Sequence, residues 1–283
     1  MTEPSSSAAG SRLCVPFVCP FCVSPLCVPG GGGVWSAAVT EFLLVVVFAA
    51  VAALYASVGH AGASGYLGVL ALAGFAAGQA RPAALVMNVA VALVASWRFG
   101  RVPGLFRWSH FLPFATASIP AAWLGGRLPL EQGAFRVAVG VVLLSAAGRM
   151  LWHVPAAEVP IERRPPLGPA LALGAVIGLA SGWIGVGGGI FLSPLLIALG
   201  WASTRQASAI AAPFILVNSL AGLAGLGLSA AAAAGPQLLA WIPAVLAGGW
   251  AGASFGSRRG SSRTLRRLLA AVLLLAGGKL LLT

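Results

Sequence analysis

The chain reads Ser181-Gly-Trp-Ile-Gly-Val-Gly-Gly-Gly-Ile-Phe-Leu-Ser-Pro-Leu-Leu196, a run of glycines between two strongly apolar segments. In a water-soluble domain such a run would be a loop between two secondary-structure elements. Here both flanks are apolar enough for a bilayer, so the sequence predicts a helix that breaks at membrane depth. A break of that kind is tolerated only where it is buried in protein or lines a water-filled cavity.

A second copy of this pattern lies upstream, at Ser57-Val-Gly-His-Ala-Gly-Ala-Ser-Gly-Tyr-Leu67. Gly59 pairs with Gly185 and Gly62 with Gly188 at one constant offset, which the two sequences keep for some distance beyond the glycines. Near the C-terminal ends of the two halves the offset is four residues larger, so Arg136 pairs with Arg266. Two glycine-broken segments at matching places in two halves are typical of the binding site of a secondary transporter.

The composition places the chain in a membrane. Of its 283 residues 59% are hydrophobic and 8% are charged, whereas soluble domains carry roughly 25% charged residues. The net charge of +12 does not indicate a nucleic-acid partner, because the basic residues stand singly or in small clusters between apolar runs. They resemble the arginines that orient membrane proteins. The lipid bilayer is the expected partner, and an alanine-, glycine- and arginine-rich composition favours a bacterial inner (cell) membrane.

Residues 1–38 are predicted to be a disordered leader or a mis-annotated N-terminal extension. All four cysteines lie in this segment, but its prolines argue against an ordered metal site, so no metal is expected. The segment is a poor signal peptide, since its apolar run is broken by proline. Val39 begins a clean membrane segment and is a plausible true start.

Ten apolar runs follow, and they predict an all-α polytopic membrane protein. Two repeated halves, 39–152 and 168–283, hold about five runs each, and a polar, proline-rich linker at 153–167 separates them. A full span needs about 20 residues. The runs at 64–77 and 189–200 are shorter than that, and each follows a glycine break, so we expect 8–10 transmembrane helices. Prolines such as Pro82 are expected at the joints between runs.

Arginine placement favours ten crossings over eight. With ten, most of the arginines, including Arg98, Arg101 and Arg205, share one side of the membrane, and both termini lie outside. Five crossings in each half would make the halves inverted with respect to each other, a common plan for secondary transporters.

With these features assembled, the chain resembles the TauE/SafE, or sulfite exporter-like, family of bacterial membrane transporters. The resemblance rests on the glycines between Gly178 and Gly189, with Pro194 and Gly200, on Ala207–Gly222, and on the upstream twin at 59–65. It covers about residues 40–282. It implies transport of sulfite, sulfonates or related small sulfur anions. Ala211-Ala212 stands where many members have Thr-Ser, and the upstream copy lacks the triple glycine, which leaves the particular substrate open.

The residues that we expect to bind substrate lie at the two breaks and on the apolar helices beside them. A helix N-terminus offers free N–H groups and a partial positive charge, and glycine lets a ligand approach the backbone. Gly178 and Gly182 are expected to serve tight helix packing instead. The candidate substrate-binding residues are Gly59, His60, Gly62, Ser64, Gly65, Asn88, Trp183, Gly185, Gly187, Gly188, Gly189 and Asn218.

Several of these residues have a structural alternative. Asn88 and Asn218 could bond a neighbouring helix rather than a substrate oxygen, and Ser64 could bond back to a helix carbonyl. His60 could couple transport to protons or make a structural bond to a carbonyl. Trp183 lies inside the break rather than at a membrane edge, so it could line the cavity.

The absence of aspartate and the placement of Glu41, Glu131, Glu158 and Glu162 near run ends or in loops argue against a cation carrier. We therefore expect a secondary carrier for a small anion that works by alternating access, with no cofactor and with protons as a candidate coupling ion. The substrate, the direction of transport and the oligomeric state stay open.

Two rival functions come from other classes. Gly62-Ala-Ser-Gly65 matches the Gly-x-Ser-Gly signature of intramembrane serine proteases, in which Ser64 would need a histidine within hydrogen-bond reach. A channel or a membrane scaffold is the other possibility. Neither is favoured over a carrier, and we do not expect an enzyme.

Overall fold

The computed structural model describes residues 34–151, 164–232 and 234–259, together with 274, 277, 278, 281 and 282. Within these residues the regular elements are all helices, as the sequence predicts. Most of the predicted leader and linker, and most of the last apolar run, lie outside the described residues. The elements are α1 (Val34–Ala56), α2 (Ala63–Leu72), α3 (Ala77–Gly100), α4 (Trp108–Arg127), α5 (Gln132–Leu151), α6 (Leu167–Ile184), α7 (Gly189–Ala198), α8 (Thr204–Leu226), α9 (Leu228–Ala232) and α10 (Leu238–Arg259).

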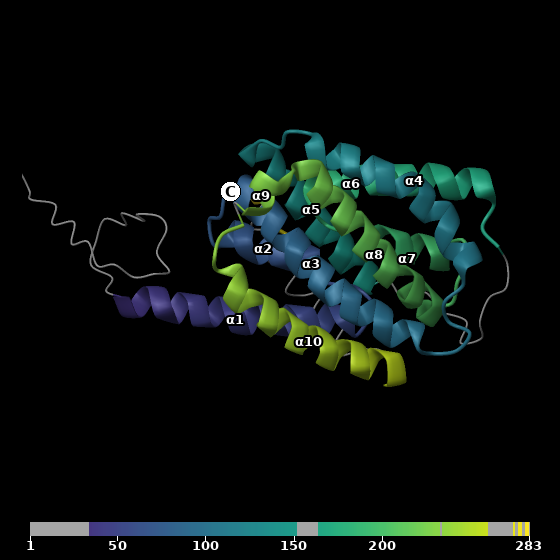
Figure 1. The fold of residues 1–283 in the computed structure, drawn as a ribbon, viewed down its shortest axis with the longest axis horizontal. Coiled ribbons are helices and arrows are strands. Elements are labelled where there is room, and N and C mark those ends of the chain that lie inside the picture. Colours follow the sequence, from purple (N-terminus) through teal and green to yellow (C-terminus); the bar gives the residue numbers. More distant parts are fainter. Residues whose placement is uncertain are drawn as a thin grey trace, which may run out of the picture.

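The long helices form a bundle with α3 and α8 at its centre. Helices α1 and α10 pack together along one side, and α4 and α6 pack together along the opposite side (Figure 1). Helix α3 contacts α8 and α10, and α8 contacts α4 and α6. The short helices α2 and α7 pack on α3 and α8, respectively. Both short helices are therefore held against the two central helices, where the site described below is formed.

Five helices in the described part of the chain are long and apolar enough to cross a membrane: the spans are Val39–Ala56, Ala77–Gly100, Leu167–Ile184, Thr204–Leu226 and Leu238–Ser257. Helices α2 and α7 are apolar but have only 10 residues each, which is half of a full span. The chain is thus a multi-pass membrane protein. The choice between eight and ten spans stays a prediction.

The helix boundary that the sequence predicts at Pro82 is not present in the structure. Pro82 lies inside α3, which begins five residues earlier at Ala77. Pro82 lacks an N–H and therefore costs α3 one backbone hydrogen bond, but the helix continues through it. Proline position alone therefore misplaces the start of this span.

Glycines bring the helices of both outer pairs into backbone contact. A Cβ atom added at Gly178 or Gly182 of α6 would collide with the carbonyl oxygens of Ser118 or Ala122 of α4. The packing role predicted for these two glycines is therefore confirmed. On the other side of the bundle, Gly248 and Gly252 of α10 approach carbonyls of α1 in the same manner, and Gly256 approaches that of Ser57, directly after α1. Close approach of this kind is how helices associate in lipid, where the hydrophobic effect is absent.

Gly252→Ala is expected to destabilise the protein by about 1–3 kcal/mol, because the new methyl group would overlap the carbonyl of Ala53 and force α1 and α10 apart. Thermal unfolding in detergent measures the effect. Gly78→Ala is the matched control, since it adds the same methyl group to a helix at a place with no heavy atom within 4 Å. An equal loss of stability in both variants would contradict the packing role of Gly252.

Candidate functional site

Both predicted breaks are present in the structure. Helix α1 ends at Ala56 and α2 begins at Ala63, while α6 ends at Ile184 and α7 begins at Gly189. The residues before α2 and α7 are Gly62 and Gly188, with φ of 99° and 79°, and Gly59, Gly185 and Gly187 also have positive φ. Residues with a side chain rarely adopt this left-handed conformation. The glycines at these five positions allow the chain to end one helix and begin the next at each break.

The two breaks meet each other, although 129 residues separate their contacting residues. The imidazole Nε2 of His60 lies 3.1 Å from the carbonyl oxygen of Gly189, and its Nδ1 lies 3.1 Å from the carbonyl oxygen of Val58. The hydroxyl of Ser208 on α8 donates to the carbonyl of Val58 at 2.9 Å. The first break is thus tied to the start of α7 and to α8.

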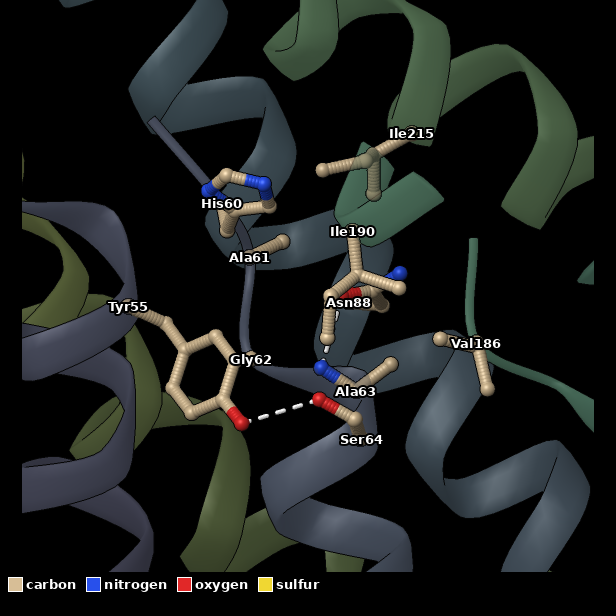
Figure 2. A pocket seen from close by; sticks show the side chains of 10 residues that line it. All are labelled: Tyr55, His60, Ala61, Gly62, Ala63, Ser64, Asn88, Val186, Ile190 and Ile215. Atoms are coloured by element: carbon tan, nitrogen blue, oxygen red, sulfur yellow. Dashed lines mark hydrogen bonds between the residues drawn. The ribbon is translucent and has the colours of Figure 1, made fainter. Parts of the chain in front are cut away.

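A small cavity lies between the breaks (Figure 2). Its volume is about 10 Å³, roughly the space that one water molecule occupies. An oxyanion would not fit, so the structure shows the site closed. The cavity is lined by Tyr55, His60, Ala61, Gly62, Ala63, Ser64, Asn88, Val186, Ile190 and Ile215.

Asn88 of α3 connects three elements at this cavity. Its Oδ1 accepts from the backbone N–H of Ala63, the first residue of α2, at 3.2 Å, and its Nδ2 donates to the hydroxyl of Ser219 on α8 at 2.9 Å. A Cβ atom at Gly187 would collide with Asn88 Nδ2. The amide of Asn88 therefore binds one of the helix N-terminal N–H groups that α2 cannot satisfy itself, and it packs against the second break.

Asn88→Ala is expected to lower the stability by about 1–3 kcal/mol, because it leaves a buried backbone N–H and a buried hydroxyl without their partner. Thermal unfolding in detergent is the measurement. Ser96→Ala on the same helix is the control, since the Ser96 hydroxyl is buried without a hydrogen-bond partner and its removal should change the stability by less than about 0.5 kcal/mol.

Ser64 and Gly65, two other predicted residues of the first break, contact α1. The hydroxyl of Ser64 donates to the phenol oxygen of Tyr55 at 2.9 Å (Figure 2), and Gly65 packs against Val51 and Tyr55. A serine protease would need the Ser64 hydroxyl to be bonded to a histidine, but here it is bonded to Tyr55.

The remaining predicted residues do not line the cavity: Gly59 of the first break lies against Ser208 of α8, and the others lie around the second break. The indole N–H of Trp183 donates to the carbonyl of Pro129 at 3.1 Å, outside the cavity. Asn218 accepts from the hydroxyl of Ser118 at 2.9 Å and donates to the carbonyl of Phe214 at 2.9 Å, joining α8 to α4. Gly188 faces both α6 and α8, Gly189 faces apolar side chains of α8, and Gly185 faces Arg81.

Two residues near the breaks were not among the sequence candidates. Tyr55 lines the cavity, and it is one of only two tyrosines in the chain, which is the signal that could have drawn attention to it. Arg81 is 6% exposed and donates to the carbonyls of Gly182 at 3.1 Å and of Gly126 and Leu128 at 3.4 Å each. Its guanidinium thus connects the C-terminal ends of α4 and α6 beside the second break.

The arrangement can hold a negative charge. Helices α2 and α7 both begin at the cavity, so the partial positive charge and the first N–H groups of each helix are directed toward the same place. The carboxylates in the described part of the chain, Glu41 and Glu131, lie near the start of α1 and in the α4–α5 connection. A group of three or more potential metal ligands was not found among the described residues.

The chain is similar to known membrane proteins. Residues 43–280 match the family described as Sulfite exporter TauE/SafE. A protein of Sinorhizobium fredii with the name "Probable membrane transporter protein y4hK" is 39% identical over 242 residues, which cover 84% of this chain and 97% of that protein. No solved structure matches the chain.

Proposed function

Because this chain belongs to the sulfite exporter TauE/SafE family of membrane transporters, we propose that it carries a small anion across the bacterial inner membrane. A sulfur-containing oxyanion or an organosulfonate is the substrate class. The carrier would work by alternating access around the two glycine breaks. The chain is a transporter rather than an enzyme in this proposal, and the bond from Ser64 to Tyr55 agrees with that.

One observation carries the proposal: two helix N-termini from distant parts of the chain begin at one closed cavity. The contact between His60 and Gly189 and the cavity lining place the first turns of α2 and α7 together. Each N-terminus is equivalent to roughly half a positive charge, and the first N–H groups of a helix have no partners within the helix itself. Such a site suits an anion and needs no arginine in direct contact with it.

The helix contacts support two repeated halves, which we propose to be inverted with respect to each other. If α1, α2, α3 and α4 correspond to α6, α7, α8 and α10, the contact of α1 with α10 corresponds to that of α6 with α4. The contact of α3 with α10 corresponds in the same manner to that of α8 with α4, and that of α2 with α3 to that of α7 with α8. Rocking of one half against the other would expose the cavity first to one side of the membrane and then to the other.

The small volume of the cavity supports a conformation of such a carrier in which the two breaks are closed on each other. A volume of about 10 Å³ admits one water but not an oxyanion, so binding requires that the two breaks move apart. Their separation would break the contact between His60 and Gly189. The contact that closes the cavity is therefore also the contact that an opening motion would break.

Counterflow in proteoliposomes tests the proposal. Vesicles loaded with unlabelled anion should transiently accumulate the same anion labelled with ³⁵S, tested separately for sulfite, thiosulfate and methanesulfonate. A channel does not show such exchange, and radiolabelled acetate serves as the control for non-specific leak. Binding is checked by thermal shift, because a ligand that binds only the native state raises its apparent stability. Absence of exchange and of any thermal shift with all three anions would refute the substrate class.

A further inference from the structure

We infer that His60 carries a proton that moves together with the anion, so that the transporter is a proton–anion symporter. This inference rests on the proposed function and names the coupling ion of the same site. Its basis is the hydrogen-bond environment of the imidazole, which is 4% exposed and lies between the two breaks.

Both ring nitrogens of His60 are placed to donate. Nδ1 lies 3.1 Å from the carbonyl oxygen of Val58, and Nε2 lies 3.1 Å from the carbonyl oxygen of Gly189. Carbonyl oxygens only accept. A neutral imidazole has one N–H, so in either tautomer one carbonyl would face a bare nitrogen lone pair, whereas the protonated ring donates to both. Only the protonated ring therefore makes both carbonyl contacts as hydrogen bonds.

When Nε2 of His60 loses its proton, a second hydrogen-bond partner is within reach. The hydroxyl of Ser193 on α7 lies 3.3 Å from the same Nε2, and it can donate to this nitrogen once the nitrogen has lost its hydrogen. The carbonyl of Gly189 then loses its bond to His60. Deprotonation thus exchanges the hydrogen bond to the carbonyl of Gly189 for one from the hydroxyl of Ser193, and both partners belong to α7.

The other titratable residues around the cavity are engaged in bonds of their own and do not carry the proton in place of His60. Helix α1 contributes the phenol of Tyr55, which is bonded to Ser64, and α2 contributes that of Tyr66, which donates to the carbonyl of Ala61. Helices α3, α7 and α8 contribute Asn88, Ile190 and Ile215 to the same cavity. The charged residues near the starts of α3 and α8, Arg81 and Arg205, bond to carbonyls at helix C-termini instead.

Proton and anion would bind together because of their charges. An imidazolium at the cavity attracts an anion at the N-termini of α2 and α7, and by linkage the bound anion favours the proton on His60 by the same factor. In each cycle the proton enters from the solution on one side, rests on His60, and leaves to the other side with the anion. For a monoanion the net charge moved is zero.

The first test uses the unmodified protein in proteoliposomes, with methanesulfonate or thiosulfate, because the charge of these anions is constant near neutral pH. The outside is held at about pH 6 and the lumen at about pH 7, on either side of the ordinary histidine pKa of about 6.5. Methanesulfonate should accumulate toward a limit of about tenfold, which one pH unit allows for one proton per monoanion, and a dye in the lumen should report acidification. Counterflow without either effect would overturn the inference but not the proposed function. Absence of counterflow and of any thermal shift with sulfite, thiosulfate and methanesulfonate would overturn both.

The second test compares His60→Gln with His110→Gln. Glutamine can still donate a hydrogen bond but does not titrate, and His110 is a buried histidine of α4 that lies away from the breaks. Accumulation driven by the pH gradient should disappear in His60→Gln, so that the inside and outside concentrations become equal, and it should stay near the unmodified level in His110→Gln. Counterflow in His60→Gln should also lose its dependence on pH. Equal accumulation by the two variants would contradict the role of His60, and the first test stands even if His60→Gln does not fold.

Discussion

Gly187→Leu is expected to reduce anion counterflow to the background of empty vesicles. Gly187 has a φ of +80°, and a Cβ atom there would collide with Asn88 Nδ2 and lie 2.9 Å from Ile215 Cγ2 and 3.0 Å from Ser219 Oγ. The left-handed conformation costs a residue with a side chain about 1–2 kcal/mol, and overpacking costs about 1–3 kcal/mol more. The strain falls directly on the Asn88 link between α2 and α8, so the geometry of the site changes even where the fold survives.

Gly200→Leu separates the effect on the site from backbone strain. Gly200 has a φ of +65° but no heavy atom within 4 Å of an added Cβ, so the control has similar conformational strain without the collision. Size-exclusion profiles and thermal unfolding identify the variants that fold. Gly200→Leu should keep most of its counterflow. Unchanged flux in folded Gly187→Leu and Gly188→Leu protein would remove the basis for a site at the breaks.

The helices were predictable because their sequence signals are local. Apolar runs of membrane length and the glycines between them predict α6 over 168–184, and the structure has Leu167–Ile184. The breaks were predictable for the same reason, since only glycine readily adopts the positive φ that is found at positions 59, 62, 185, 187 and 188. Pro82 shows the limit of such signals: a proline is compatible with the early turns of a helix as well as with a joint.

The side-chain partners at the site were not predictable, because they depend on which helices meet. Asn88 could have bonded a substrate or a neighbouring helix on sequence grounds, and the closed structure gives it Ala63 and Ser219. Trp183 shows the same limit in another way. Its place within the break was predictable, but the direction of its indole toward Pro129 depends on how α4 ends. The contact between His60 and Gly189 joins the two halves of the chain, and no pattern within one half encodes it.

Arg81→Met is expected to lower the free energy of unfolding by about 2–4 kcal/mol, because a buried charged donor that reaches three carbonyls would be lost. The last carbonyls of α4 and α6 have no partner within their own helices, and the partial negative charge at a helix C-terminus adds to their attraction for a guanidinium. Arg81→Lys should recover only part of the loss, since an ammonium group is a point charge without the planar fork of arginine. Denaturant unfolding in detergent measures both variants.

Arg205→Met is the control for the loss of an arginine from the start of a central helix. Arg205 lies near the start of α8 as Arg81 lies near the start of α3, but its side chain is exposed and donates to a single carbonyl, that of Ser257, at 2.8 Å. Its removal should cost less than about 1 kcal/mol, because water can replace an exposed partner. Equal losses in the two methionine variants would mean that Arg81 acts only through its charge. A larger loss in Arg81→Met, with partial recovery in Arg81→Lys, would instead mean that the ends of α4 and α6 are fixed next to the second break by the shape of the guanidinium.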